Sequence, residues 1–226
     1  MELEQSIVNN ACKVIKKHMD YIEPLVMQSD KQDREISGAI CRSDIYDGDT
    51  FVVLRKGGKW QSQTVSCPIG TTKLVDFHTH PDEPTIEPSV DDMKKIIIHD
   101  TPECIGTVEK EGYDIDIESP MDILRKIRNS KSRVKFRCYR SKNLPVVRDI
   151  REERKDLAIR EGEELFNMAK ANVNGDQKSY RVAKMMFNKI VGKKRANTNK
   201  IKRIFDDATV KCDVTGEWKK EYELTR

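Results

Sequence analysis

Apolar residues recur along this chain with two different spacings, and each spacing predicts one kind of element. Between Leu3 and Met27 they stand three or four positions apart, which predicts a helix that Pro24 ends, followed by a polar loop at 29–34. Shorter apolar runs bounded by glycine, proline or polar residues predict strands. We expect strands at residues 35–41, 51–55, 61–67, 74–80, 104–109, 113–117 and 134–139, and helices at 89–99 and 121–127.

The pattern changes after Val147, where long charged helices replace the short strands. Residues 148–170 carry oppositely charged side chains three and four positions apart, the spacing of neighbours on a helix surface. Polar residues at 172–176 interrupt this helix, a second helix begins at 180–190, and a hairpin that turns near Gly216 is expected at 210–222. The apolar stripes expected to face a core contain Leu157, Leu165, Phe166 and Ala169 on the first helix, and Val182, Met185, Met186 and Ile190 on the second.

Charge divides the chain near the same place. Of the 42 Lys and Arg, 21 lie in residues 1–141 together with 24 Asp and Glu, which gives that part a net charge of −3. Residues 142–226 hold the other 21 basic residues and 14 acidic ones, a net charge of +7. We therefore predict an α/β domain at 1–141 and a charged, basic and mainly helical C-terminal extension at 142–226.

Neither membrane insertion nor secretion is expected from the apolar content. No apolar run approaches the roughly 20 residues that cross a bilayer, and the first residues are acidic where a secretion signal would be basic. These features predict a cytoplasmic protein without a membrane partner. The cysteines are dispersed without a C-x-x-C pair, which favours reduced thiols over disulfides and argues against a cysteine-based zinc site. They are Cys12, Cys41, Cys67, Cys104, Cys138 and Cys212.

Two histidines stand at alternate positions of a predicted strand. Because strand side chains alternate between the two faces of a sheet, His78 and His80 point the same way and can reach one metal ion. Asp92, in the first turn of the helix expected to begin at Ser89, is the candidate third ligand. Three protein ligands leave the fourth position of a tetrahedral zinc ion open to water, as in catalytic zinc sites. Taken singly these features are weak, since Ser89 followed by Asp92 is also an ordinary helix-start signal.

Together with an upstream glutamate they form a more specific pattern. Glu35 opens the run EISGAI, and HTHP at 78–81 is followed by seven residues, Ser89, two residues and Asp92. This resembles the signature of the JAMM (MPN+) zinc metalloprotease family, which is H-[ST]-H-P-x7-S-x-x-D after a glutamate and a Gly-containing strand. The resemblance is to the prokaryotic, archaeal or viral members and covers about residues 1–140.

The resemblance implies a fold, a site and an activity. The implied fold is a curved mixed sheet flanked by helices, similar to the cytidine-deaminase-like sandwich. His78, His80 and Asp92 would bind one zinc ion whose fourth ligand is water. Glu35 would act as the general base, and Ser89 would help to stabilise the oxyanion. The implied function is a zinc-dependent isopeptidase or peptidase that hydrolyses the bond after the C-terminal tail of ubiquitin or a ubiquitin-like modifier.

Other functions fit the same residues less well or stay open. The D-x-H-x-H run ending at His80 also resembles barrel phosphoesterases and amidohydrolases, but only 146 residues follow it, too few for a barrel of roughly 250. Eight Lys and Arg and no acid lie between 184 and 203, a segment suited to nucleic acid or to an acidic protein. The alternative function is therefore that of a RadC-like or viral relative whose basic region binds nucleic acid, with peptidase activity on other substrates or none. Arg42 stands where many relatives have glycine, which leaves the substrate-binding edge open.

Overall fold

The chain folds into two compact units. The computed structural model describes residues 2–45, 49–56, 65–81, 86–111 and 131–220. One unit, here called the sheet unit, comes from the stretches 2–88, 101–140 and 210–226, and the other, the helical unit, from 89–100 and 141–209. The end of the chain therefore returns to the sheet unit after the helices. The domain division expected from charge and periodicity stays a prediction.

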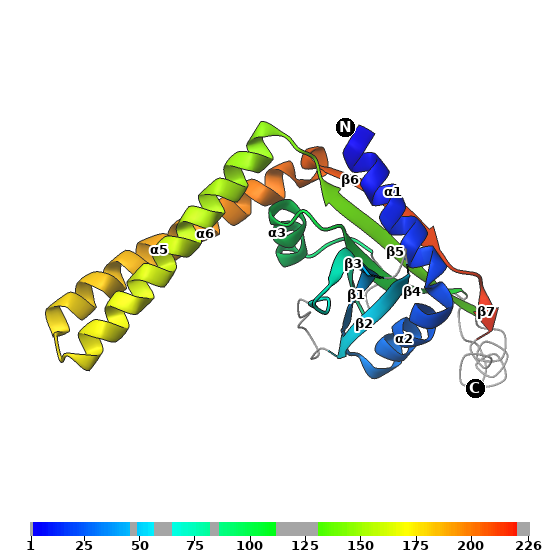
Figure 1. Ribbon diagram of the computed structural model, residues 1–226, viewed down its shortest axis with the longest axis horizontal. Coiled ribbons are helices and arrows are strands. Elements are labelled where there is room, and N and C mark those ends of the chain that lie inside the picture. Colours follow the sequence, from blue (N-terminus) through cyan, green and yellow to red (C-terminus); the bar gives the residue numbers. More distant parts are fainter. Residues whose placement is uncertain (1, 46–48, 57–64, 82–85, 112–130, 221–226) are drawn as a thin grey trace, which may run out of the picture. The chain divides into compact units, whose positions relative to one another are not determined.

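The described residues form a seven-stranded mixed sheet at the centre of the sheet unit (Figure 1). The strands are β1 (Ile36–Ser43), β2 (Thr50–Lys56), β3 (Thr71–Thr79), β4 (Glu103–Glu111), β5 (Lys131–Ser141), β6 (Thr209–Thr215) and β7 (Lys219–Lys220). Their order is β2-β1-β3-β4-β5-β6, with β7 also paired to β5. β3 and β4 are parallel, whereas β1 pairs antiparallel with β2 and β3, and β4 pairs antiparallel with β5. The predicted α/β class with a mixed sheet is confirmed.

Two N-terminal helices, α1 (Glu2–Lys17) and α2 (Met19–Gln32), pack against one face of this sheet. Every second residue of β3, such as Val75 and Phe77, faces them, because strand side chains alternate between faces. Val8 and Ile22 of the two helices are fully buried in the same core. The intervening residues of β3 consequently project from the opposite face of the sheet.

The first predicted helix is in fact two helices, and the break lies at His18 rather than at Pro24. His18 leaves helical geometry with φ −100° and ψ 10°, and its Nε2 lies 2.7 Å from the hydroxyl oxygen of Thr50. Pro24 lies in the second turn of α2, where it removes only one backbone donor. Ile22 and Val26, on either side of it, are buried, and this packing outweighs the lost hydrogen bond.

Gly38 of β1 makes room for an aromatic ring of β3. A Cβ at Gly38 would lie 2.2 Å from Cζ of Phe77, far inside van der Waals contact. Gly106 makes the same room for Phe136, where a Cβ would lie 2.5 Å from Cε1. The two rings meet edge to face with centroids 6.1 Å apart. These contacts pack β1, β3, β4 and β5 together next to the histidines.

The helical unit contains α3 (Val90–Ile98) and a long hairpin of α5 (Pro145–Val173) and α6 (Gln177–Ala208). Pairs across the hairpin show that the two helices are antiparallel, since Lys194 bonds Glu161 and Asn197 donates to Glu153 over 2.8 Å. Buried positions recur at heptad-like spacings, as in a coiled coil. They are Val147, Ile150, Leu157 and Ala171 on α5, and Ala183, Ile190, Asn197, Ile201, Phe205 and Ala208 on α6.

The apolar stripes expected on these helices are only partly correct. Leu157 and Ile190 are buried, but Phe166 is 69% exposed and Met185 is 51% exposed. A two-helix hairpin buries only a narrow strip of each helix, so helical spacing alone does not select the buried side. The expected core residues that are exposed instead are Leu165, Phe166, Ala169, Val182, Met185 and Met186.

The end of the chain does not form the expected hairpin with a turn at Gly216. β7 pairs with β5 rather than with β6, and the Gly216 N–H donates to the Val134 carbonyl of β5 over 2.8 Å. β6 and β7 thus follow each other along the same edge of β5.

Of the predicted strand at 61–67, the described residues Val65, Ser66 and Cys67 are not in a strand. The strand at 113–117 and the helix at 121–127 lie outside the described residues.

All six cysteines are paired in disulfides, which contradicts the expected free thiols. The pairs are Cys12–Cys212, Cys41–Cys67 and Cys104–Cys138, with sequence separations of 200, 26 and 34. The prediction of reduced thiols was wrong because cysteines that are far apart in the sequence are brought side by side by the sheet.

Among the described helices, none combines the length and apolar character needed to span a membrane.

Candidate metal centre

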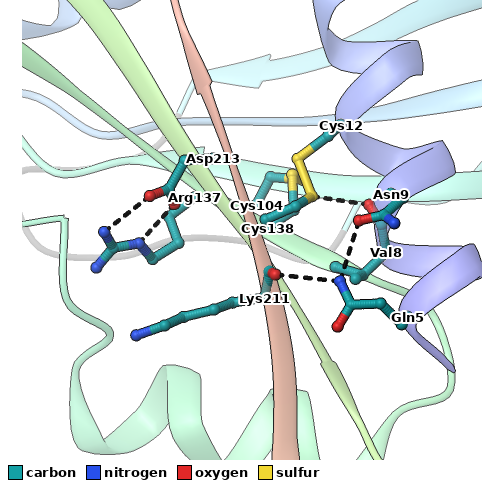
Figure 2. Close-up of a disulfide and its surroundings, with 10 residues drawn as sticks. Gln5, Val8, Asn9, Cys12, Cys104, Arg137, Cys138, Lys211 and Asp213 are labelled. Atoms are coloured by element: carbon teal, nitrogen blue, oxygen red, sulfur yellow. Dashed lines mark hydrogen bonds and ion pairs between the residues drawn. A yellow bond between two sulfur atoms is a disulfide. The ribbon is translucent and has the colours of Figure 1, made fainter. Parts of the chain in front are cut away.

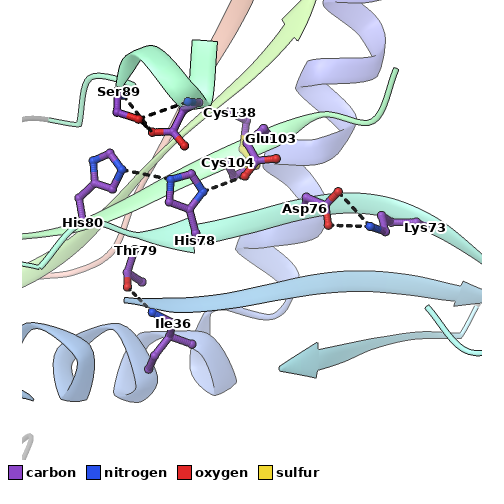
Figure 3. A network of polar contacts seen from close by, with 11 residues as sticks. Ile36, Lys73, Asp76, His78, Thr79, His80, Ser89, Glu103, Cys104 and Cys138 are labelled. Carbon is purple, nitrogen blue, oxygen red and sulfur yellow. Dashed lines mark hydrogen bonds and ion pairs between the residues drawn. A yellow bond between two sulfur atoms is a disulfide. The ribbon is translucent and has the colours of Figure 1, made fainter. Parts of the chain in front are cut away.

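The two histidines of the motif lie together at the end of β3 (Figure 3). His78 is the penultimate residue of the strand, and His80 follows directly after it, held by its N–H, which donates to the Gly106 carbonyl over 2.9 Å. Both side chains project from the sheet face opposite α1 and α2. Their Nε2 atoms are 3.1 Å apart, and the residues are 1% and 7% exposed. The expectation that both imidazoles point the same way is therefore correct.

Glu103 orients His78 from the neighbouring strand. Its Oε1 lies 2.7 Å from Nδ1 of His78, and the parallel register that pairs Glu103 with Asp76 brings it to this face. A carboxylate accepts only, so the hydrogen bond requires a proton on Nδ1 and leaves the Nε2 lone pair of a neutral ring for a metal. Sequence reasoning missed Glu103, because an acid at the start of a strand carries no local sign of its partner.

Glu35 lies directly before β1. Ser37, two residues further on, pairs with His78 in the antiparallel register of β1 and β3, so the start of β1 runs beside the part of β3 that carries His78. The Ile36 N–H donates to the Thr79 hydroxyl over 2.9 Å, which fixes the start of the strand. Glu35 itself is partly exposed, and its expected role as general base stays a prediction.

Ser89 and Asp92 form a capping box at the start of α3, in the helical unit. The Asp92 N–H donates to Oγ of Ser89, and the Ser89 N–H donates to Oδ2 of Asp92 over 2.9 Å. The Ser89 hydroxyl also donates to Oδ2, at 2.5 Å. Both donors act on the same carboxylate oxygen and fix the orientation of this buried side chain. The contacts assign Ser89 to holding Asp92, and its expected role at the oxyanion stays a prediction.

The donor set has the chemistry that a zinc ion requires. Zn–N bonds of roughly 2.0–2.1 Å at a tetrahedral angle separate two ligating nitrogens by about 3.3 Å, close to the observed 3.1 Å. Two protonated imidazoles would repel each other at this distance, whereas neutral rings sharing a cation would not. His78, His80 and Asp92 are all buried and can each supply one ligand atom to a metal ion.

Comparisons with known proteins leave the family open. No protein-family model matches the chain, and no curated protein matches it. The link to the JAMM family therefore rests on the motif residues and on the fold class, and it is carried forward as a proposal.

Proposed function

We propose that this chain is a zinc-dependent isopeptidase or peptidase of the JAMM type, with His78, His80 and Asp92 as the metal ligands. The observation that carries the proposal is the buried imidazole pair, with His78 oriented by a carboxylate at 2.7 Å. Metal-binding histidines regularly donate their second ring N–H to a carboxylate in this way. The capping box fixes the orientation of the buried Asp92, and this supports Asp92 as the third ligand.

Each residue of the proposed site has a separate role in peptide hydrolysis. A zinc ion bound here would polarise the scissile carbonyl and lower the pKa of a water to about 7. Glu35 takes the proton of the attacking water and delivers it to the leaving amine, which has to depart in its neutral form. Glu103 keeps the His78 ring in its Nδ1-protonated form, and Ser89 keeps the Asp92 carboxylate in one orientation.

The substrate class we propose is the C-terminal tail of ubiquitin or of a ubiquitin-like modifier. An extended tail binds by adding a strand to a sheet edge, where main-chain hydrogen bonds hold residues without side chains. Among the described strands, β2 stands at one end of the order, and its edge is the one proposed here for the tail. Arg55 of β2 pairs with Ser37 of β1, which in turn pairs with His78 of β3. The three residues stand in one row across the sheet, so this end of β2 is the end nearer to the histidines.

The direct test measures bound zinc and cleavage in the same preparations. Wild-type protein should hold about one zinc through these ligands and cleave at least one member of a panel of ubiquitin-like fusions, with activity lost to a chelator and restored by zinc. His80→Ala should lose both the zinc and the activity. Glu35→Gln should keep the zinc and lose activity, because only the proton transfer is removed.

Two variants control for nonspecific damage. His99→Ala removes an exposed histidine beyond the end of α3, and Glu109→Gln removes a carboxylate of β4 away from the imidazoles. Both should keep zinc and activity. In the disulfide-bonded protein, zinc that persists after loss of His78, His80 and Asp92 together would contradict the ligand assignment, and activity in Glu35→Gln would contradict the proposed mechanism.

Nucleic-acid binding by α6 is the second candidate function. Of the eight cations at 184–203, only Lys194 is drawn into the hairpin, by its bond to Glu161. The other seven are exposed. A phosphate backbone bound there should dissociate with rising salt, with a slope of log affinity against log salt of about −0.9 for each neutralised phosphate. A salt-independent or undetectable affinity of the full chain for DNA and RNA would exclude this function.

A further inference from the structure

Four cysteines from four different elements meet in the core of the sheet unit (Figure 2). Cys12 comes from α1, Cys104 from β4, Cys138 from β5 and Cys212 from β6. They form the disulfides Cys12–Cys212 and Cys104–Cys138, and the two pairs are adjacent. The Sγ atoms of Cys12, Cys138 and Cys212 all lie within 4.8 Å of one another, and Cys104 is bonded to Cys138.

The fold, rather than sequence spacing, brings these sulfurs together. Cys104 and Cys138 are directly opposite each other in the antiparallel register of β4 and β5. Cys12 lies on the buried side of α1, one helical turn from Val8 and close to Ile15. β6 runs beside β5 and brings Cys212 to the same place. Structural zinc sites have four protein ligands, and four cysteine sulfurs are one common set.

We propose that the reduced form of this cluster binds one thiophilic cation, Zn²⁺ in the first instance, through Cys12, Cys104, Cys138 and Cys212. Zn–S bonds of roughly 2.3 Å at a tetrahedral angle set the sulfurs about 3.8 Å apart, within the spread that three of them already show. Four protein ligands leave no open position, so this metal would stabilise the fold and take no part in hydrolysis. It lies on the helix-covered side of the sheet, whereas His78 and His80 project from the other side.

The chemistry balances with a phosphine or dithiol as reductant. Each disulfide takes up two electrons and two protons and becomes two thiols. A phosphine is oxidised to its oxide with the oxygen atom and the two protons of one water molecule, whereas a dithiol gives up its two protons and becomes a disulfide. The cation then binds the sulfurs as thiolates and releases up to four protons to the solvent, so its affinity falls as pH falls. A zinc ion with four thiolate ligands carries a net charge of −2. Cys212 is the most exposed of the four ligands, so this charge lies at the edge of the core rather than at its centre.

The oxidised and metal-bound forms exclude each other, because both use the same four sulfurs. In the oxidised form the disulfides join α1 to β6 and β4 to β5. In the reduced form one cation would join all four elements at once. The redox state of the surroundings therefore selects which of the two crosslinks the sheet unit carries.

The test uses the full-length protein after reduction by a phosphine and removal of the phosphine without oxygen. Cd²⁺ or Co²⁺ is then added, and absorption from thiolate-to-metal charge transfer is recorded, a signal that histidine and carboxylate ligands do not give. We expect it to saturate at one equivalent. His78→Ala/His80→Ala should keep the signal, which separates this site from the proposed catalytic one.

Matched serine variants decide between this cluster and other thiols. Cys212→Ser, at a half-buried position of an edge strand, should lose most of the signal, whereas Cys41→Ser/Cys67→Ser should keep it. In the His78→Ala/His80→Ala background, zinc should also raise the unfolding temperature of the reduced protein, but not when Cys212→Ser or Cys12→Ser is added. No charge-transfer absorption in the reduced wild type, or the same absorption in Cys212→Ser, would overturn the proposal.

Discussion

Removing the carboxylate that orients His78 tests the metal centre without touching a ligand. Glu103 accepts a hydrogen bond from Nδ1 over 2.7 Å, and both groups are nearly buried, so little water is at hand to replace the bond. In Glu103→Ala the His78 ring loses its orientation and its preferred protonation. In Glu103→Gln the amide oxygen can still accept the bond, and only the negative charge is lost.

The size of the effect follows from the kind of contact. Partners that hold a metal-binding histidine typically contribute 10–100-fold to metal affinity. That range corresponds to about 1.4–2.7 kcal/mol at 25 °C. We expect Glu103→Ala to lie in this range and Glu103→Gln to fall between it and wild type, since a hydrogen bond to a charged acceptor is stronger than one to a neutral amide.

Zinc affinity is measured by competition with a chromophoric chelator, together with the zinc-dependent rise in unfolding temperature. Glu109→Gln is the control, because Glu109 lies on the same strand and the same face but bonds Arg133 and Lys135 instead. It should bind zinc as wild type does. Wild-type zinc affinity in Glu103→Ala would refute the idea that the His78 contact prepares a metal ligand.

Three further predictions concern the rest of the chain. Leu157→Ala should destabilise the protein by about 2–5 kcal/mol and Phe166→Ala by less than about 0.5 kcal/mol, measured by denaturant unfolding, because only the first side chain is buried. Gly38→Ala should destabilise by at least about 1–3 kcal/mol in the same assay, since the new methyl group overlaps a ring. The hydrogen bond from Arg137 lowers the pKa of Asp213, so the stabilising effect of this pair is present above the unfolded pKa near 3.9 and is lost as pH falls through the folded value. Asp213→Asn should therefore cost about 0.2–1 kcal/mol at pH 7 and progressively less as the pH falls through the folded pKa, and a cost that does not change with pH would count against the pair.

The parts of the fold that local patterns specify could be predicted from the sequence. β1, β3 and β4 are short apolar runs, and the capping box of α3 needs only Ser89 and Asp92 three residues apart. His78 and His80 share a face because strand geometry has a period of two. Each of these features depends on residues within a few positions of one another.

Features that depend on pairing between distant segments could not be predicted. Glu103 reaches His78 only because β3 and β4 are parallel neighbours, and Cys12 meets Cys212 across 200 residues. In the hairpin, the buried strip of α6 includes the polar Asn197, while the apolar Phe166 of α5 is exposed. Charged and amide groups that pair across the hairpin remove the contrast in hydropathy on which such a prediction relies.

The base of the hairpin has a consequence for how this chain is assembled. Lys142, where β5 gives way to α5, donates its N–H to the carbonyl of Ala208, where α6 gives way to β6, over 2.7 Å. The chain thus leaves the sheet at the end of β5 and returns to it at the start of β6, and these two points are adjacent. A tight turn of two residues could therefore join β5 to β6 with no change in their pairing. The two long helices are therefore an insertion between the two strands of a β-hairpin. Evolution or protein engineering could lengthen, exchange or delete these helices while the register of β5 and β6 stays the same.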